Sequence, residues 1–422
     1  MENTPRPGCW SVCQMPDVAE VGRKGEDIKS DCWVRLELTS SGDIVVEQTS
    51  KVSVMYGKQN DALCKEVLAA LGVESAKVTL VDTGAVPFVI AARLEAAVKR
   101  LQPANRKEYL PEMDKKCVYG TTKDRLRRSR LYIPGDQPKY MLNAGIYKPD
   151  AVILDLEDAV APPVKEETRF VVRNALRKVD FMGCERMVRI NQGEMGIKDL
   201  DYIVPHNVHV VLIPKCEDPA MVRKVDARCK AIIAEKGDGR GGHGPVYLMP
   251  IVESGLGIVR AYEIASATDT VCALAIGLED YTADIGTQRT NEGKESFHAR
   301  SALVNAARAA GVQPIDSVFS DVQDMEALKA SCLEAKSLGF DGKGCIHPRQ
   351  IKVIHDAFAP SAAEIEKAKK IVLAFEQAEK EGKGVVALGT KMIDPPVVKR
   401  ALRTVNLAVS QGLLKKDWRQ VP

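Results

Sequence analysis

Eight short apolar runs, each followed by an amphipathic helical segment, constrain the fold of this chain more than any other feature. They occupy residues 129–134, 151–156, 186–191, 208–214, 246–252, 271–277, 313–319 and 340–346. Continuous apolar strands that alternate with helices indicate parallel strands covered on both faces. Eight such units in about 230 residues fit a (β/α)8 barrel of the TIM type, which typically takes about 250. A doubly wound parallel sheet is the alternative fold.

The region before these units predicts a separate, smaller domain. Strand-like patterns lie at 32–37, 43–47 and 77–81, and helical patterns lie at 61–72 and 87–101. Residues 1–24 are polar and contain Pro and Gly, so we expect them to be irregular. Together these patterns predict a small α/β domain, of the α+β kind.

A linker and a C-terminal extension complete the predicted organisation. The stretch 102–124 is charged and contains two prolines, which is typical of a linker. Helices are predicted beyond the eighth unit, where they must pack outside the barrel. We therefore expect the small domain, the linker, the barrel and the helical extension at 1–101, 102–124, 125–360 and 361–422.

Composition excludes several classes of protein. The net charge is +3, from 60 basic and 57 acidic residues, so charge offers no argument for a nucleic-acid or membrane partner. No apolar run approaches the roughly 18 residues that a spanning helix needs. The 11 cysteines are an odd number and several lie in apolar runs, which indicates buried thiols in a reducing compartment. No secretory signal precedes them, so we expect a cytoplasmic protein.

Reactive groups of barrel enzymes lie where the strands end, at the C-terminal face. The predicted strand ends are acidic, with isolated cations. The side chains found there are Asp155, Glu157, Asp158, Arg189, Asn191, Lys215, Glu253, Ser254, Glu279, Asp280, Asp321 and His347.

Glu253 and Asp280 follow consecutive predicted strands, and neighbouring strands are only about 4.8 Å apart. Two carboxylates so close repel each other unless a cation lies between them. Mg²⁺ binds one or two protein carboxylates and leaves its other positions to water or substrate. The pair therefore predicts an open Mg²⁺ site. The alternative is that each carboxylate forms an ion pair with a basic residue on a loop.

Two cations at the strand ends also allow more than one interpretation. Arg189 at the end of an apolar strand indicates a buried anionic partner, either a substrate group or the carboxylate of Asp155 or Glu157. Lys215 is expected to contact a phosphate or carboxylate, with a Schiff base to a carbonyl substrate as the alternative.

Seven motifs carry a resemblance to a known family. They are RRSRLYIPG at 127–135, AVILDLEDAV at 151–160, VRIN at 188–191, ESGLG at 253–257, AIGLEDY at 275–281, LGFDGKGCIHPRQ at 338–350 and KMIDPP at 391–396. In this order they resemble the citrate lyase beta subunit family, which also contains the malyl-CoA and citramalyl-CoA lyases. The resemblance is specific to the family and not to one member.

This resemblance implies a Mg²⁺-dependent (β/α)8 lyase that cleaves a carbon–carbon bond of 3-hydroxyacyl thioesters. By motif, it places the metal on Glu253 and Asp280 and the substrate arginine at Arg189, as the strand ends do. It also implies that Asp394, in KMIDPP, enters the active site of a neighbouring subunit. The protein would then be a homo-oligomer, with a trimer or hexamer expected, and Asp394 is the candidate base.

Three basic residues are candidates for the phosphates of a CoA or carrier-linked thioester. Arg127, Arg128 and Lys165 lie in or next to the motifs, and the resemblance implies such a contact. The alternative is that they only solvate a surface.

The N-terminal domain resembles the citrate lyase acyl carrier (gamma) subunit, through GEDIKSDCWVRL at 25–36 and the stretch 63–93. That carrier attaches a dephospho-CoA-derived arm through a serine. Here Lys29 and Ser30 precede Asp31, and the attachment position falls on Lys29. Lysine cannot form the phosphodiester, whereas Ser30 can if the register differs. Otherwise the domain is a docking or assembly module.

Three functions follow from these patterns. The first is cleavage of a citryl thioester to oxaloacetate and an acetyl thioester. For this function a citrate lyase alpha subunit is a candidate partner. The second is a free malyl-CoA or citramalyl-CoA lyase with a vestigial carrier domain, which Lys29 favours. The third is a non-catalytic assembly subunit, against which Glu253, Asp280 and Arg189 argue.

Overall fold

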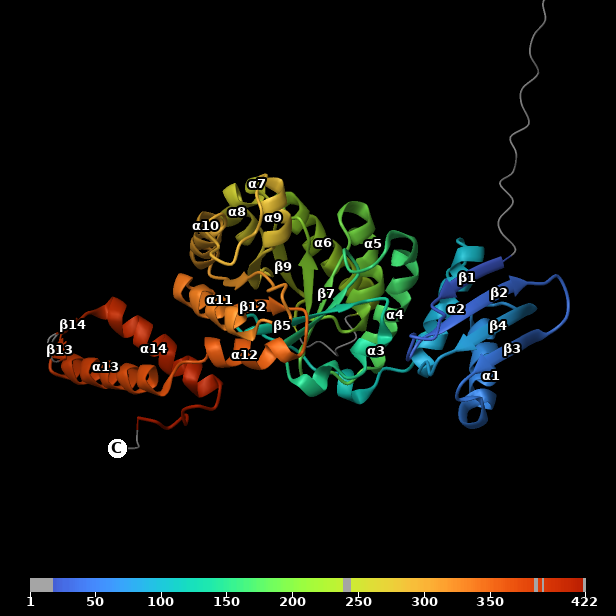
Figure 1. The fold of residues 1–422 in the computed structure, drawn as a ribbon, viewed down its shortest axis with the longest axis horizontal. Coiled ribbons are helices and arrows are strands. Elements are labelled where there is room, and N and C mark those ends of the chain that lie inside the picture. Colours follow the sequence, from blue (N-terminus) through green and yellow to red (C-terminus); the bar gives the residue numbers. More distant parts are fainter. Residues whose placement is uncertain (1–17, 238–243, 383–385, 389–390, 420–422) are drawn as a thin grey trace, which may run out of the picture.

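The computed structural model describes residues 18–237, 244–382, 386–388 and 391–419. Figure 1 shows a central barrel with the N-terminal domain on one side and a pair of C-terminal helices on the other. No described helix is long and apolar enough to cross a membrane.

Eight parallel strands close into the barrel and follow one another around it in chain order. They are β5 (Ser129–Pro134), β6 (Ala151–Asp155), β7 (Glu185–Arg189), β8 (Val210–Ile213), β9 (Tyr247–Val252), β10 (Ala273–Ile276), β11 (Gln313–Asp316) and β12 (Gly342–Cys345). Each predicted apolar run overlaps one of these strands. The (β/α)8 prediction is confirmed, and the closure of β12 onto β5 excludes the doubly wound alternative.

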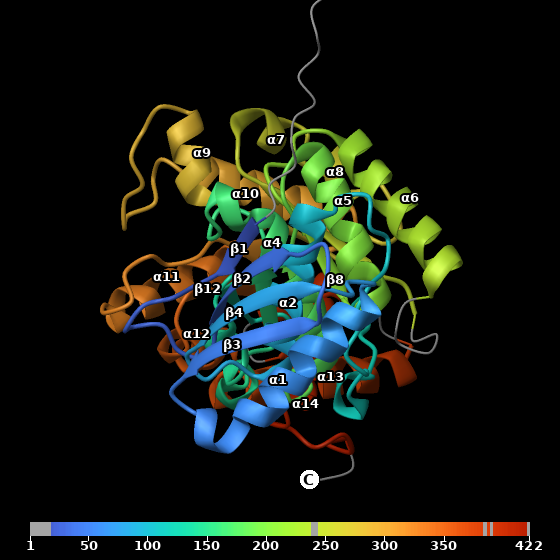
Figure 2. The ribbon, with the colours of Figure 1, turned by 90° about the vertical axis from the view of Figure 1, so that its right-hand side faces the viewer.

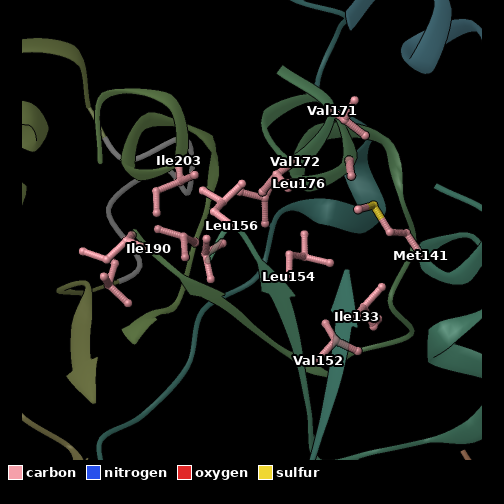
Figure 3. Packing of buried hydrophobic residues seen from close by; sticks show 14 of the residues in the cluster. Ile133, Met141, Val152, Leu154, Leu156, Val171, Val172, Leu176, Ile190 and Ile203 are labelled. Carbon is pink, nitrogen blue, oxygen red and sulfur yellow. The ribbon is translucent and has the colours of Figure 1, made fainter. Parts of the chain in front are cut away.

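Helices surround the barrel because the strands are apolar on both faces. They are α3 (Pro138–Met141), α4 (Lys165–Lys178), α5 (Gly193–Ile203), α6 (Pro219–Lys236), α7 (Gly255–Val259), α8 (Ala261–Ala265), α9 (Leu278–Asp284), α10 (Phe297–Ala309), α11 (Met325–Leu338) and α12 (Arg349–Phe358). Successive side chains of a strand point to opposite faces. In β6, Val152 and Leu154 therefore pack toward α4 residues such as Val172 (Figure 3), whereas Ile153 joins the inner cluster of the barrel.

The N-terminal domain is a four-stranded sheet with two helices. Its strands are β1 (Val18–Gly22), β2 (Cys32–Leu38), β3 (Ile44–Ser50) and β4 (Ala76–Asp82), in the order β1-β2-β4-β3, and its helices are α1 (Ser53–Ala70) and α2 (Pro87–Leu101). Alternate residues of β2 and β4 are buried, so one face of the sheet is covered. Figure 2 shows this domain in front of the barrel.

Two predictions for the N-terminal domain are corrected. Val18–Gly22 is a strand and not irregular, because it pairs antiparallel with β2 from Val18↔Glu37 to Gly22↔Trp33. This pairing partner lies outside the segment, so its local composition could not reveal it. The first helix begins at Ser53, earlier than the predicted 61–72. The sequence pattern missed its first turns because they are largely exposed and therefore lack an apolar periodicity.

The C-terminal extension is a helical pair, α13 (Ala362–Lys380) and α14 (Pro395–Ser410), joined by the hairpin β13 (Val386–Leu388) and β14 (Lys391–Ile393). Ser361 and Glu364 form a capping box that starts α13. The pair has its own apolar cluster, which includes Val372 and Val405, and it extends away from the barrel (Figure 1).

Candidate active site

The two predicted metal carboxylates lie together at the C-terminal end of the barrel. Glu253 directly follows β9, and Asp280 lies in the first turn of α9, which follows the neighbouring strand β10. The side chains of Glu253 and Asp280 share a hydrogen bond. Gly277 leaves room for the side chain of Glu253, because a Cβ at position 277 would lie 2.7 Å from Oε2 of Glu253.

The environment of the pair shifts the pKa values of the two carboxyl groups in opposite directions. Burial, together with the hydrogen bond to Asp280, raises the pKa of Glu253 to about 8. Burial alone would also raise the pKa of Asp280. The hydrogen bonds that Asp280 makes with Glu253 and Lys215 outweigh that effect and hold its pKa below the usual value. The pair therefore holds a proton or a cation more readily than two separate carboxylates would.

Lys215 contacts both members of this pair. Its Nζ lies 3.2 Å from Oδ1 of Asp280, and its backbone N–H donates to Oε1 of Glu253 at 3.1 Å. Its backbone is left-handed, with φ of 46°. Burial lowers the pKa of Lys215, but Asp280 and Asp158 outweigh burial and the net pKa is raised. Lys215 is thus a charged group that faces carboxylates, which disfavours the Schiff-base alternative.

Arg189 is held in a fixed orientation by Asp155. Its Nε and Nη2 donate to the two carboxylate oxygens of Asp155 at 2.7 and 2.6 Å. Nη1 lies 3.0 Å from Oε2 of Glu157, and the guanidinium stands over the ring of Tyr132 at 5.3 Å. Burial would lower the pKa of Arg189, but its bond to Asp155 outweighs this and raises the pKa. The alternative interpretation, a pairing of Arg189 with Asp155 and Glu157, is therefore present, and it fixes the orientation of a cation near Glu253 and Asp280.

Lys165 lies at the same face of the barrel. It is the first residue of α4, and its Nζ donates to Oδ1 of Asn191 at 2.7 Å, just beyond the end of β7. Glu253 and Asp280 are in contact and Arg189 lies near them, whereas the described contact of Lys165 is with Asn191, so its predicted role toward a substrate phosphate stays a prediction.

The donor set fits a divalent cation with an open coordination sphere. Among the described residues, no cluster of three or more His, Cys, Asp or Glu side chains is arranged to hold a metal. Glu253 is buried, and within the described part of the chain its recorded partners are Asp280 and a backbone N–H of Lys215, not a basic side chain. Mg²⁺ takes one or two carboxylates and keeps water or substrate oxygens in its other positions, so two carboxylates suffice.

Arg127 and Arg128 lie at the opposite end of the barrel, so the predicted contact with substrate phosphates at the active site is wrong. Both precede β5, and the N-terminal ends of parallel strands gather away from the C-terminal face. Arg127 is fully buried, and its Nε donates to Oε2 of Glu185 at 2.7 Å. Arg128 binds both carboxylate oxygens of Asp150 at 2.8 Å. Both arginines of the motif therefore form structural ion pairs.

Asp394 lies in the C-terminal extension and caps α14, where its side chain accepts from the N–H of Val397 at 3.1 Å. Figure 1 shows α14 projecting away from the barrel of its own chain. The single chain therefore does not bring Asp394 to Glu253 and Asp280.

The predicted attachment segment of the carrier-like domain is a tight loop before β2. Lys29 is exposed, and Ser30 is left-handed with φ of 55°. The N–H of Ser30 donates to the carbonyl of Thr83 at 3.1 Å. Asp31 follows and is buried.

Two site residues escaped the sequence argument. Gly277 makes room for Glu253, and a glycine between an apolar strand and an acidic pair was the available signal. Tyr132 lies under Arg189, and it projects from β5 into the inner barrel cluster. Nothing in the local pattern distinguishes Tyr132 from an ordinary apolar strand residue.

Two sequence families match the chain in separate parts. The model of the family described as HpcH/HpaI aldolase/citrate lyase matches residues 128–348, which span the whole barrel from β5 to β12. The chain belongs to this family. The model of an acyl carrier family described as malonate decarboxylase delta subunit (MdcD) matches residues 23–101.

Curated relatives of the family extend the match to most of the chain. Citrate lyase subunit beta of Haemophilus influenzae is 41% identical over 288 residues, covering 68% of this chain and 98% of the relative. Mitochondrial citramalyl-CoA lyase of Homo sapiens is 32% identical and covers 67% of this chain and 86% of the relative. Both confirm the family resemblance carried by the seven motifs.

A solved structure of the same family is similar in fold. It is the protein CitE from Mycobacterium tuberculosis in complex with magnesium, acetoacetate and coenzyme A. It is 30% identical, with a TM-score of 0.56, and covers 68% of this chain and 99% of its own.

Proposed function

We propose that this protein is a Mg²⁺-dependent lyase that cleaves a carbon–carbon bond of a 3-hydroxyacyl thioester. The favoured substrate is a citryl thioester, which yields oxaloacetate and an acetyl thioester. The observation that carries the proposal is the contact of Glu253 with Asp280 at the ends of neighbouring strands, beside the oriented cation Arg189. The citrate lyase beta relatives and the magnesium complex of a similar protein support it.

Glu253 and Asp280 would hold the metal. When bound, Mg²⁺ supplies Lewis acidity to the hydroxy-acid end of the substrate. The supporting observation is the acidic pair itself, since two carboxylates in contact need a cation or a proton between them.

Arg189 stabilises the negative charge that develops when the bond breaks. The proton leaves the 3-hydroxyl group, a carbonyl forms at that carbon, and the electron pair of the broken C–C bond moves to the thioester as an enolate. A cation already oriented by Asp155 needs no reorganisation at that moment, which is the condition for strong electrostatic stabilisation. The enolate then takes a proton and leaves as the shorter thioester.

We propose Asp394 of a neighbouring subunit as the base that removes the hydroxyl proton. Its place on an extension that projects from its own barrel supports an arrangement between subunits, as does its motif. The functional unit is then a homo-oligomer, a trimer or hexamer. Mixing the inactive variants Glu253→Gln and Asp394→Asn tests this, since shared sites regain activity in mixed oligomers. Two variants that stay inactive after mixing would contradict it.

The second candidate is a lyase for malyl-CoA or citramalyl-CoA. Lys29 at the expected attachment position favours it, because lysine cannot carry the phosphodiester-linked arm. The citramalyl-CoA lyase relatives also support this substrate class. Detection of that arm on Ser30 by mass spectrometry would favour the carrier form and a partner such as a citrate lyase alpha subunit. The non-catalytic assembly role is the remaining alternative.

The deciding experiment offers citryl-CoA, malyl-CoA and citramalyl-CoA to the purified chain, with Mg²⁺ or with EDTA. We expect one thioester to be cleaved only with Mg²⁺. The control variant Glu253→Gln keeps the size of the side chain and should be inactive at equal metal. Cleavage that persists in EDTA, or in this variant, would contradict the proposed metal site.

We also propose a cytoplasmic location. The described cysteines, which include Cys32, Cys64 and Cys345, are all free and buried. Unpaired thiols of this kind are typical of a reducing compartment.

A further inference from the structure

One buried arginine joins the N-terminal domain to the active-site end of the barrel. Arg93 on α2 is fully buried and bonds three separate segments. Its Nε and Nη2 donate to Asp31 at 3.1 and 2.9 Å, and its Nη1 donates to Glu167 at 3.0 Å. Its Nη2 also donates to the backbone carbonyl of Asp136 at 3.3 Å. Asp31 lies in the carrier-like loop, Glu167 in the first turn of α4, and Asp136 in the loop after β5.

The loop after β5 leads directly to the residue that orients Arg189. Gly135 precedes Asp136, and its N–H donates to the backbone carbonyl of Asp155 at 2.8 Å. A Cβ at Gly135 would lie 2.5 Å from that carbonyl and 2.9 Å from Cγ2 of Thr168. The loop thus packs against β6 and α4 without free space, so that a shift of Asp136 presses on Asp155.

We infer that Arg93 is a positioning residue of the lyase. Through the backbone of Asp136 it fixes the loop after β5, and through that loop it fixes Asp155 and Arg189. The N-terminal domain is then held against the loop after β5 and the first turn of α4 by buried ion pairs. This inference rests on the proposed function for its activity readout.

The same interface contains a second buried pair that serves as a matched control. Arg173 on α4 bonds Glu95 on α2 at 3.1 and 2.5 Å, and both side chains are fully buried. Arg173 also donates to the carbonyl of Tyr109 in the linker, at 3.1 Å. None of its recorded contacts in the described residues reaches the loop after β5. If Arg93 only held the domains together, Arg93 and Arg173 would be equivalent.

The test compares Arg93→Lys with Arg173→Lys in the full chain. Lysine keeps the charge but loses the fork of donors that spans several acceptors. We expect both variants to lower the melting temperature by similar amounts. Only Arg93→Lys should lower kcat, by about tenfold with KM changed less than threefold, because a displaced Arg189 weakens stabilisation of the transition state. Arg173→Lys should keep kcat within about twofold of wild type.

Hydrogen exchange at Gly135 supplies a readout that needs no substrate. Its amide is protected by the bond to Asp155 and should exchange faster in Arg93→Lys but not in Arg173→Lys. Equal effects of both variants on kcat and on exchange would overturn the inference, as would wild-type values in Arg93→Lys. If wild type cleaves no thioester, the proposed function has failed, and exchange at Gly135 still decides whether Arg93 fixes the loop.

Discussion

Replacing Gly277 by alanine tests whether the position of Glu253 controls the reaction. Gly277 has φ of −111°, which alanine adopts without strain. Its added Cβ would lie 2.7 Å from Oε2, 2.8 Å from Cγ and 2.9 Å from Cδ of Glu253. Since contacts below 3.4 Å are tighter than usual, Oε2 must move by about 0.7 Å. The substitution therefore displaces a proposed metal ligand without removing any polar group.

The expected loss follows from the size of this displacement. A misplacement of about 1 Å costs on the order of 100-fold in rate, or about 2.7 kcal/mol of transition-state stabilisation. We expect Gly277→Ala to lower kcat/KM by 10- to about 100-fold. The Mg²⁺ concentration for half-maximal activity should rise as well, because Glu253 meets the ion less well. Fold and melting temperature should change little.

Steady-state cleavage of the thioester at a series of Mg²⁺ concentrations measures both effects. Gly255→Ala is the matched control, because it lies two residues from Glu253 and its Cβ would meet nothing closer than 3.6 Å. That variant should behave as wild type. Wild-type kcat/KM and metal dependence in a folded Gly277→Ala protein would refute the reasoning.

Three further perturbations have defined outcomes. Arg127→Met leaves Glu185 buried without its ion-pair partner, so the free energy of unfolding in urea should fall by about 3–5 kcal/mol while KM stays unchanged. A large rise in KM with normal stability would instead support the phosphate-binding role. Burial lowers the pKa of His206 to about 2, so this group stays neutral in the fold and protonates only in the unfolded chain below about pH 6.5. The stability that the neutral His206 contributes is present above pH 6.5 and is lost as the pH falls. Between pH 7.5 and 5.5 the free energy of unfolding of wild type should therefore fall by about 1.4 kcal/mol more than that of His206→Gln, and equal decreases would contradict this. Asp155→Asn removes the charge of the carboxylate that binds both Nε and Nη2 of Arg189, while Glu157 remains, and should lower kcat by about tenfold, with wild-type kcat as the contrary result.

Most of the barrel could be predicted because its information is local. A strand covered on both faces must be apolar throughout, as Ala151–Asp155 is, and this pattern recurs eight times. The proximity of the two proposed metal ligands was also predictable, because parallel strands end at one face. Glu253 and Asp280 therefore had to lie close together once the strand order was known.

The errors arise where a residue's role depends on which end of a strand it occupies or on a distant partner. Arg127 and Arg128 precede the N-terminal end of β5, away from the face where the strands end, and their partners Glu185 and Asp150 are remote in sequence. The strand Val18–Gly22 likewise depends on pairing with β2.

The amino-acid sequence alone determined the barrel, the acidic pair and the cation Arg189, since periodicity and strand ends are properties of contiguous residues. Only the tertiary structure decided how these groups are held. Asp155 grips Arg189 through two hydrogen bonds, Gly277 admits the carboxylate of Glu253, and Arg93 binds the carrier-like domain to the loop beside them. Each of these contacts joins segments that are far apart in the chain, and a local sequence pattern carries no information about how close such segments come in the fold.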